Sequence, residues 1–209
     1  MRNIITVYDN FFEEPEDIRN KALEQNFYYC DELDNVAVAD KEDDDEILEI
    51  LKIGMTFPGQ RSLSCEDILP DIYNDFNKKI SSFMPNDNVK INALFQKQTN
   101  DDFRNIHQDG NPSLAGVIYL DKTPAFNTGT CFYKHKKTGW DGTTEMPKED
   151  DTEEWEIKAF QMAHDNFEKH SSIGNKFNRM VMYDANMIHC AEGAGDERLT
   201  LAFFVYSGK

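Results

Sequence analysis

Two histidines and one aspartate have the side-chain types and the spacing of a metal site. His107 and Asp109 form a His-x-Asp motif just before an apolar, strand-like run at residues 115–120, and His189 lies further along the chain. In an extended chain, residues i and i+2 project from the same face, so His107 and Asp109 can hold one ion together. Two histidines and one carboxylate on one side of a metal leave positions open, as in non-haem Fe(II) sites.

Zinc is the competing metal for these three ligands. Structural zinc sites usually recruit four protein ligands, often thiolates, whereas the four cysteines contain no C-x-x-C pair. The cysteine spacing therefore indicates neither a zinc knuckle nor a disulfide framework, and a reducing compartment is expected. Cys190 would project to the strand face opposite His189, where we expect it to pack.

Arg198 follows His189 by nine residues and begins an apolar strand pattern. Alternate residues of that strand would pack on helices, while Arg198 points into a barrel. A buried arginine is costly without an anionic partner, which a bound carboxylate would supply. The alternative is an arginine that reaches solvent or pairs with Glu192 or Asp196, and the sequence leaves both open.

Length and charge limit the class of protein. At 209 residues with no visible linker, we expect a single domain over residues 1–209. The 22 basic and 39 acidic residues give a net charge of -17, which disfavours nucleic acid as a partner. We find neither a secretory signal nor the ~18 apolar residues of a membrane span. A cytoplasmic protein is expected, and the oligomeric state stays open.

Residues 1–86 are expected to supply a first strand and supporting helices. The strand is placed at residues 4–8, and Pro15 opens a helix with an apolar side. Residues 31–49 are rich in Asp and Glu and indicate a solvated loop. Residues 57–62 have turn chemistry.

A second helix is expected after this turn. Ser64 and Asp67 are its candidate N-terminal caps, and apolar residues recur at every fourth position from Ile68 to Ile80, with Phe83 three residues further on. Pro70 is tolerated only in the first turns. We expect this helix to lie against a sheet.

Residues 87–206 change to a strand-like period. After an alternating stretch that begins at Val89, strand-like runs lie near residues 105–109, 115–121, 129–134, 179–184, 187–191 and 197–206. Helices first and many strands after predict an α+β protein whose C-terminal half is a β-sandwich or barrel. The long connection at about 134–176 is expected to contain a helix at roughly 150–169, either as a lid or as decoration.

The ordered set His107, Asp109, His189 and Arg198 resembles the Fe(II)/2-oxoglutarate-dependent dioxygenases, most closely their prolyl-hydroxylase-like branch, over roughly residues 88–206. Many members of that branch continue with Tyr-Leu-Asn/Asp, and Tyr-Leu-Asp stands here from Tyr119 onward. A Gly-Gly-x-Thr/Leu-x-Phe element often follows, and the sequence Asn-Thr-Gly-Thr-Cys-Phe that ends at residue 132 is an imperfect copy of it.

The resemblance implies a double-stranded β-helix (jelly-roll or cupin-like) core, with the N-terminal helices packed on one sheet and a helical insertion. It implies that His107, Asp109 and His189 bind Fe(II), and that Arg198 with Tyr119 holds the distal carboxylate of 2-oxoglutarate. Dioxygen would take the remaining position. The implied reaction is hydroxylation of a C–H bond, in a prolyl residue of a peptide or protein or in a small molecule such as a free amino acid.

Other functions stay open at this point. Nucleic-acid demethylases of the superfamily carry a second arginine six positions after the first, where this chain has Phe204. The acidic composition favours a neutral or basic partner through steering. One rival hypothesis is a non-catalytic double-stranded β-helix binding module. Another is a cupin-like metal isomerase or hydrolase that does not use 2-oxoglutarate.

Overall fold

Two antiparallel β-sheets form the body of the protein. The computed structural model describes residues 5–30, 57–84, 89–102, 106–145 and 164–207. The larger sheet has the strand order β1-β7-β4-β9-β3-β2 and the smaller sheet the order β6-β5-β8. The strands are β1 (Thr6–Asp9), β2 (Gln60–Ser64), β3 (Val89–Gln98), β4 (Leu114–Tyr119), β5 (Thr130–His135), β6 (Phe167–Ile173), β7 (Arg179–Asp184), β8 (His189–Ala191) and β9 (Arg198–Ser207). The helices are α1 (Pro15–Leu23), α4 (Cys65–Ile68) and α5 (Pro70–Ser81), with a short 3-10 helix η2 (His164–Asn166).

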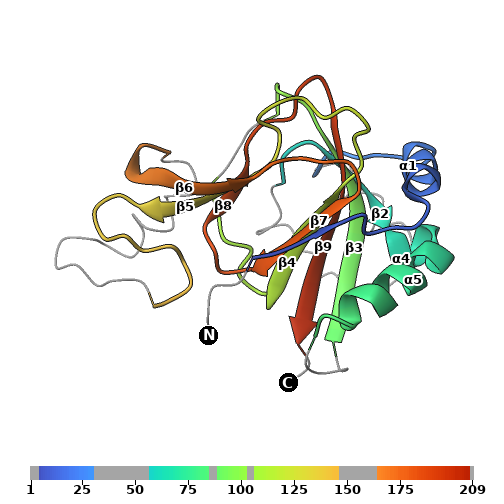
Figure 1. Ribbon diagram of the computed structural model, residues 1–209, viewed down its shortest axis with the longest axis horizontal. Coiled ribbons are helices and arrows are strands. Elements are labelled where there is room, and N and C mark those ends of the chain that lie inside the picture. The colour runs from blue at the N-terminus through green and yellow to red at the C-terminus, as the bar shows by residue number, and fades with distance from the viewer. Residues whose placement is uncertain (1–4, 31–56, 85–88, 103–105, 146–163, 208–209) are drawn as a thin grey trace, which may run out of the picture.

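The layers follow from this order. Figure 1 shows α1, α4 and α5 together on one side of the large sheet, and β5, β6 and β8 on the other side. The predicted α+β class and double-stranded β-helix core, with N-terminal helices on one sheet, are confirmed. The interior that can hold a site is therefore the space between the two sheets.

Strand β9 shows why the two faces of the large sheet differ. Its apolar alternate residues, Leu199, Leu201, Phe203 and Val205, belong to the core that the helices cover. The ring of Phe203 meets Phe76 of α5 edge-on, with ring centroids 5.4 Å apart. Since successive strand residues point to opposite faces, the polar residues of β9 turn toward the interior.

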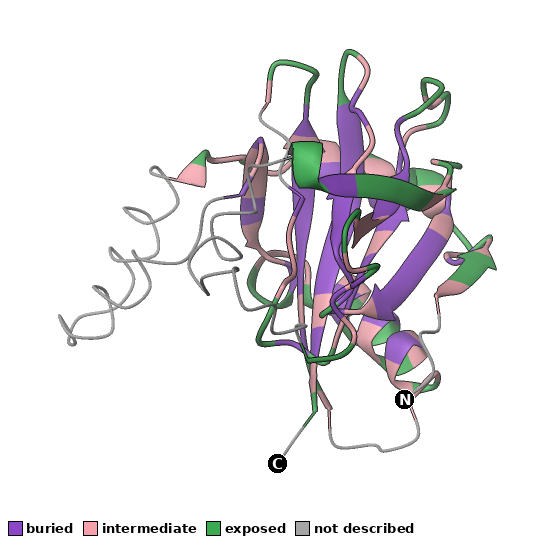
Figure 2. Ribbon diagram, turned by 90° about the vertical axis from the view of Figure 1, so that its left-hand side faces the viewer, coloured by how far each residue is buried: buried purple, intermediate pink, exposed green. Residues whose placement is uncertain are grey.

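The interior between the sheets has its own, smaller apolar cluster. Tyr119, Phe132, Val181 and Tyr183 are its main buried members, drawn from both sheets. Figure 2 shows the buried residues as bands along most of the strands, with exposed residues in the loops and along much of β6. Side chains thus fill much of the interior, and polar groups occupy selected positions in it.

The predicted second helix is two helices. Ser64 caps α4 as expected, because its hydroxyl accepts a hydrogen bond from the backbone N–H of Glu66. Leu69 has φ -142° and ψ 62° and separates α4 from α5, which begins at Pro70. The residue before a proline is restricted from the α region, so Pro70 starts a new helix where we expected it to be absorbed into the first turns. The first strand and the first helix form as predicted.

Three further predictions are wrong in part. Residues 60–64 form β2 along the edge of β3, although residues 57–62 were expected to be a turn. The run at 105–109 contributes only an isolated bridge at His107. Residues 167–169 belong to β6, paired with β5, where the end of a helix at 150–169 was expected. For residues 60–64 and 167–169, pairing with a strand distant in sequence decided the outcome over the local pattern.

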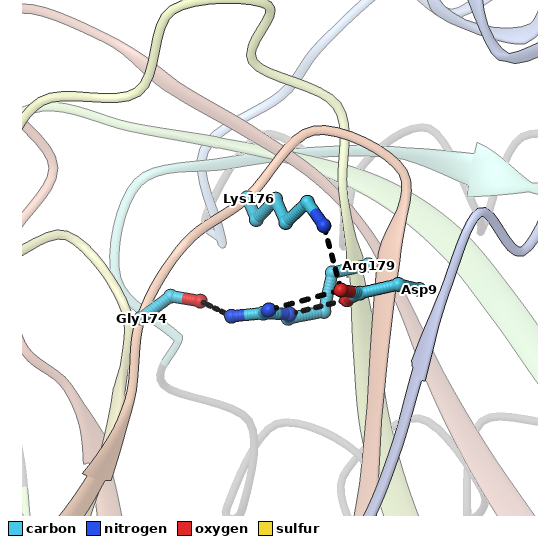
Figure 3. Close-up of polar contacts among 4 residues, drawn as sticks. All are labelled: Asp9, Gly174, Lys176 and Arg179. Atoms are coloured by element: carbon cyan, nitrogen blue, oxygen red, sulfur yellow. Dashed lines mark hydrogen bonds and ion pairs between the residues drawn. The ribbon is translucent and has the colours of Figure 1, made fainter.

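An ion-pair cluster holds the edge strand β1 to β7 (Figure 3). Arg179 donates to both carboxylate oxygens of Asp9, from Nε at 2.6 Å and from Nη2 at 3.2 Å. Lys176 Nζ lies 2.6 Å from the same carboxylate, and Arg179 Nη1 also donates to the Gly174 carbonyl. These bonds hold the pKa of Asp9 well below its usual range.

Two predicted features lie outside the described residues: the acidic stretch at 31–49 and residues 150–163 of the expected insertion helix. Among the helices of the described ranges, none combines the length and apolar character needed to cross a bilayer.

Candidate metal centre

A pair of backbone hydrogen bonds places the two histidines beside each other. The N–H of His107 donates to the carbonyl of His189 at 3.0 Å, and the N–H of His189 donates back at 2.9 Å. The two imidazole rings are consequently close, with centroids 4.4 Å apart. One ligand precedes β4 and the other begins β8, so the pair depends on the closure of the barrel.

Asp109 completes a group of three possible ligands. Its backbone N–H donates to the carbonyl of Ala185 at 2.9 Å, which fixes the turn after β7 against it. Its carboxylate oxygens lie 3.6 Å from Nε2 of His107 and 3.4 Å from Nε2 of His189. One ligand atom from each of the three residues lies within 4.8 Å of the others. The structure thus brings together the three residues predicted to bind metal.

These distances fit a single metal ion. Ligand atoms about 2.1 Å from one ion lie about 3 Å apart when adjacent and about 4 Å apart when opposite. The carboxylate oxygen Oδ2 of Asp109 is also buried without a hydrogen-bond partner. Because buried polar atoms are almost always satisfied, a carboxylate oxygen that lies 3.4 Å from Nε2 of His189 without a hydrogen bond suits a cation there.

The protonation of His189 favours its use as a ligand. Its Nδ1 lies 2.9 Å from the carbonyl of Met187, so the ring proton sits on Nδ1 and leaves the Nε2 lone pair toward Asp109. Burial lowers the pKa of His189 to about 4, against the opposing attraction of Asp109. Burial alone would raise the pKa of Asp109, but the two histidines and Arg61 lower it overall. At neutral pH the centre therefore offers the neutral imidazole of His189 and the carboxylate of Asp109, with His107 beside them.

Arg198 lies inside the barrel with a neutral partner. The residue is 3% exposed, and its Nη1 donates to Oε1 of Gln98 on β3 at 2.5 Å. Its Nε has no hydrogen-bond partner. Glu192, one of the acids considered for it, pairs with Lys169. Because Arg198 is buried, the alternative of an arginine that reaches solvent is ruled out.

Polar groups next to Arg198 complete this end of the interior. Tyr119, fully buried, has its ring 5.3 Å from the guanidinium carbon of Arg198, and its hydroxyl lies 2.7 Å from Oγ1 of Thr130. The hydroxyl of Thr200, on the same face of β9 as Arg198, is buried without a partner. Arg198 and Tyr119 thus lie together, as predicted.

The strand register relates the metal centre to Arg198. Leu114 at the start of β4 pairs with Val205, and Tyr119 at its end pairs with Thr200. The metal centre adjoins the start of β4, whereas Arg198 adjoins its end. The inward face of β9 therefore leads from one to the other, past Phe204, Ala202 and Thr200.

Two residues of the interior were missed by sequence reasoning. Gln98 could have been found from the alternation of β3, because it lies on the same face as Gln96. Gln98 pairs with Arg198, and Gln96 pairs with Thr200. Arg61 comes from β2, which its turn-like sequence concealed. Its guanidinium lies over the ring of Phe57, with 4.1 Å between the guanidinium carbon and the ring centroid.

The family of the chain follows from its sequence. Residues 54–202 match the sequence model of DUF6445, described as a family of unknown function. The chain belongs to DUF6445. No curated protein matches this DUF6445 member in sequence.

Solved structures show which fold the DUF6445 chain shares. HygX from Streptomyces hygroscopicus, with nickel and 2-oxoglutarate bound, superposes with a TM-score of 0.61 at 10% identity, over 97% of this chain and 82% of HygX. SnoN, a non-heme alpha ketoglutarate dependent epimerase from nogalamycin biosynthesis, superposes with a TM-score of 0.52 at 11% identity, over 99% of this chain and 79% of SnoN. The DUF6445 chain therefore has the fold of Fe/2-oxoglutarate-dependent enzymes.

A Pseudomonas putida prolyl-4-hydroxylase also matches, with a TM-score of 0.49 and 13% identity over 98% of this chain and 93% of that protein. This likeness is too weak to indicate a substrate for the DUF6445 chain.

Proposed function

We propose that this protein is an Fe(II)- and 2-oxoglutarate-dependent dioxygenase that hydroxylates a C–H bond, in a prolyl residue or in a small molecule such as a free amino acid. One observation carries the proposal: a three-ligand cluster and a buried arginine, which forms no ion pair with any described residue, lie at opposite ends of the same inward strand face. A dicarboxylate that binds a metal through one end needs the metal site for that end and a positive charge, such as Arg198, for the other.

The cluster is suited to iron with exchangeable positions. His107, Asp109 and His189 supply three ligands from one side, which leaves room for a bidentate co-substrate and dioxygen. The Nδ1–H of His189, held by the Met187 carbonyl, fixes the orientation of one imidazole. Bound Fe(II) and 2-oxoglutarate would supply the oxidising chemistry, and the chain would supply position and exclusion of water.

The end of the interior where Arg198 lies is suited to a carboxylate. Gln98 orients Arg198 without neutralising it, because an amide oxygen accepts a hydrogen bond but carries no charge. The free Nε of Arg198 and the hydroxyl of Thr200 are both buried and unpaired. A carboxylate beside them would satisfy both atoms and the charge. Tyr119 and Thr130 form the neighbouring polar wall.

The comparisons support the proposal at the level of fold. HygX binds nickel and 2-oxoglutarate, and SnoN is a ketoglutarate-dependent epimerase. A cupin-like metal enzyme that ignores 2-oxoglutarate and a non-catalytic binding module remain the rivals to be separated by experiment.

The test is calorimetric titration of 2-oxoglutarate into metal-free and Mn(II)-loaded protein, followed by measurement of succinate with Fe(II) and air. We expect 2-oxoglutarate binding only with metal present. Asp109→Ala should lower metal affinity by at least about tenfold and abolish succinate formation, because it removes the carboxylate ligand. His170→Ala is the matched control, since His170 is exposed on β6, and it should change neither.

Metal binding without any response to 2-oxoglutarate would support the cupin-like alternative. Failure to bind either would favour the non-catalytic module and contradict the proposal.

A further inference from the structure

Arg61 brings a second positive charge to the wall of the interior. It lies on β2 opposite Gln96 of β3, which in turn pairs with Thr200 of β9. Residues paired across neighbouring strands point to the same face, so Arg61 shares the inward face of the sheet with Thr200. Its guanidinium carbon lies 4.1 Å from the ring centroid of Phe57 and 5.9 Å from that of Phe204.

The charge of Arg61 is desolvated and uncompensated. Its Nε is buried without a hydrogen-bond partner, and no described residue forms an ion pair with its guanidinium. Burial lowers the pKa of Arg61 to about 10, against the opposing attraction of Asp109, so the group is still charged at neutral pH. Stacking on aromatic rings offsets only part of the cost of such a charge. The residue as a whole is partly exposed, which leaves part of the side chain accessible.

Arg61 is directed toward the metal end of the interior. Phe204, beneath its guanidinium, pairs with Ala115 near the start of β4, whereas Arg198 adjoins the far end of that strand. Ala115 in turn pairs with Tyr183, whose ring centroid lies 4.7 Å from that of His189. A group held by Arg61 would therefore lie beside the metal centre, away from the carboxylate position at Arg198.

The charges of the loaded site leave room for one more anion. A divalent metal would be balanced by Asp109 and by the co-substrate carboxylate that binds it, and the distal carboxylate would balance Arg198. The positive charge of Arg61 then remains, in surroundings of low polarity where an unpaired charge is expensive. A monoanion at this point would make the site neutral.

We propose that Arg61 binds a carboxylate of the substrate itself, next to the metal centre. This inference rests on the proposed function and narrows it. Of the two substrate classes named above, it selects a free amino acid or another small carboxylic acid, because a prolyl residue inside a peptide chain has no carboxylate of its own. The overall charge of -17 repels anions at long range, so Arg61 must act locally, through paired N–H donors.

The test uses paired probes that differ only in charge: L-proline with L-prolinamide, phenylacetate with phenylacetamide, and acetate with acetamide. Each is titrated into protein already loaded with Mn(II) and 2-oxoglutarate. We expect at least one acid to bind about tenfold or more tightly than its amide, the factor expected from a charge-assisted hydrogen bond. Arg61→Gln should abolish this difference while 2-oxoglutarate affinity stays within about twofold of wild type.

Lys97→Gln is the matched control. Lys97 lies next to Gln96 on β3 but on the opposite, outer face, beside Phe27 and Glu197. It removes the same charge from the same region and should leave the preference for acids intact. The melting temperature gives a further readout: Arg61→Gln should keep or raise it, because the variant removes an unpaired charge.

Four results would overturn the inference: amides that bind as tightly as acids, no acid binding to loaded wild-type protein, a preference that survives in Arg61→Gln, or a lower melting temperature in that variant. A loss of 2-oxoglutarate affinity in Arg61→Gln would assign Arg61 to the co-substrate and overturn it as well. If loaded wild-type protein cannot be prepared because 2-oxoglutarate does not bind, the proposed function itself fails.

Discussion

Arg179 and Arg198 each begin a strand, β7 and β9, yet their surroundings are opposite. Arg179 lies beside the edge strand β1 and donates two hydrogen bonds to the carboxylate of Asp9 on that strand. Arg198 lies in the interior, where its side-chain hydrogen-bond partners among the described residues are the neutral groups of Gln98 and Tyr119. Asp121 is near enough to be attracted by Arg198, but its carboxylate accepts hydrogen bonds from the Leu199 backbone and from Asn175, and no described acid forms an ion pair with Arg198. The difference separates a charge that holds two strands together from a charge kept for a ligand.

The largest expected effect on 2-oxoglutarate binding comes from replacing Arg198. Arg198→Gln should weaken 2-oxoglutarate binding to Mn(II)-loaded protein by about a hundredfold or more, because the loss of a buried charge partner costs about 2–5 kcal/mol. The free energy of unfolding should stay the same or rise, since Arg198 has no acidic partner to lose. Calorimetry and denaturant titration measure the two quantities. A destabilised variant with normal co-substrate affinity would mean that Arg198 resembles Arg179 after all.

A smaller effect is expected from giving Arg198 an acid of its own. Gln98→Glu should create an internal ion pair that competes with the co-substrate carboxylate, because Gln98 already contacts Nη1. We expect the affinity for 2-oxoglutarate to fall about tenfold, the size of a charge-assisted hydrogen bond. Gln96→Glu, one inward position along β3, is the comparison variant. Equal affinity in Gln98→Glu and wild type would contradict the role of an uncompensated Arg198.

The smallest effect is expected at the paired arginine. Arg179→Gln should lower the free energy of unfolding by about 1 kcal/mol or less at pH 7, because the Asp9 carboxylate is about one-third exposed and screened by solvent. The depressed pKa of Asp9 gives stability that is complete above the unfolded value of about 4 and lost as the pH falls below it. Wild type and variant should therefore converge on acidification, as followed by urea unfolding at several pH values. A constant difference would mean that Arg179 acts through packing.

Much of the fold and of the candidate site could be predicted because the relevant signals are local. The alternation of β9 separates Arg198 from Leu199 and its apolar neighbours, and the sequence alone placed them on opposite faces, as the structure does. The three metal ligands could likewise be proposed from local signals, namely the His107-x-Asp109 spacing and a histidine at position 189 in a short strand-like run. Their convergence needed only a barrel that closes.

The remaining features depend on pairing between distant segments. Gly59, with φ +74°, gave a turn signal that concealed β2, and only its pairing with β3 brings Arg61 into the interior. Residues 167–169 carry a helix-like charge bias, but pairing with β5 makes them a strand. The alternation of β3 indicates that Gln98 lies on the inward face. It does not indicate that Gln98 pairs with Arg198, because that pairing depends on the register between β3 and β9.

The reciprocal hydrogen bonds between His107 and His189 also set the order of events when the protein is made. The two ligands lie in segments far apart in the chain, and the second is positioned only when β8 has paired with β5. Contacts of such long range form late in folding. Under the proposed function, the three ligands are therefore in place to capture a metal ion only after the barrel has closed.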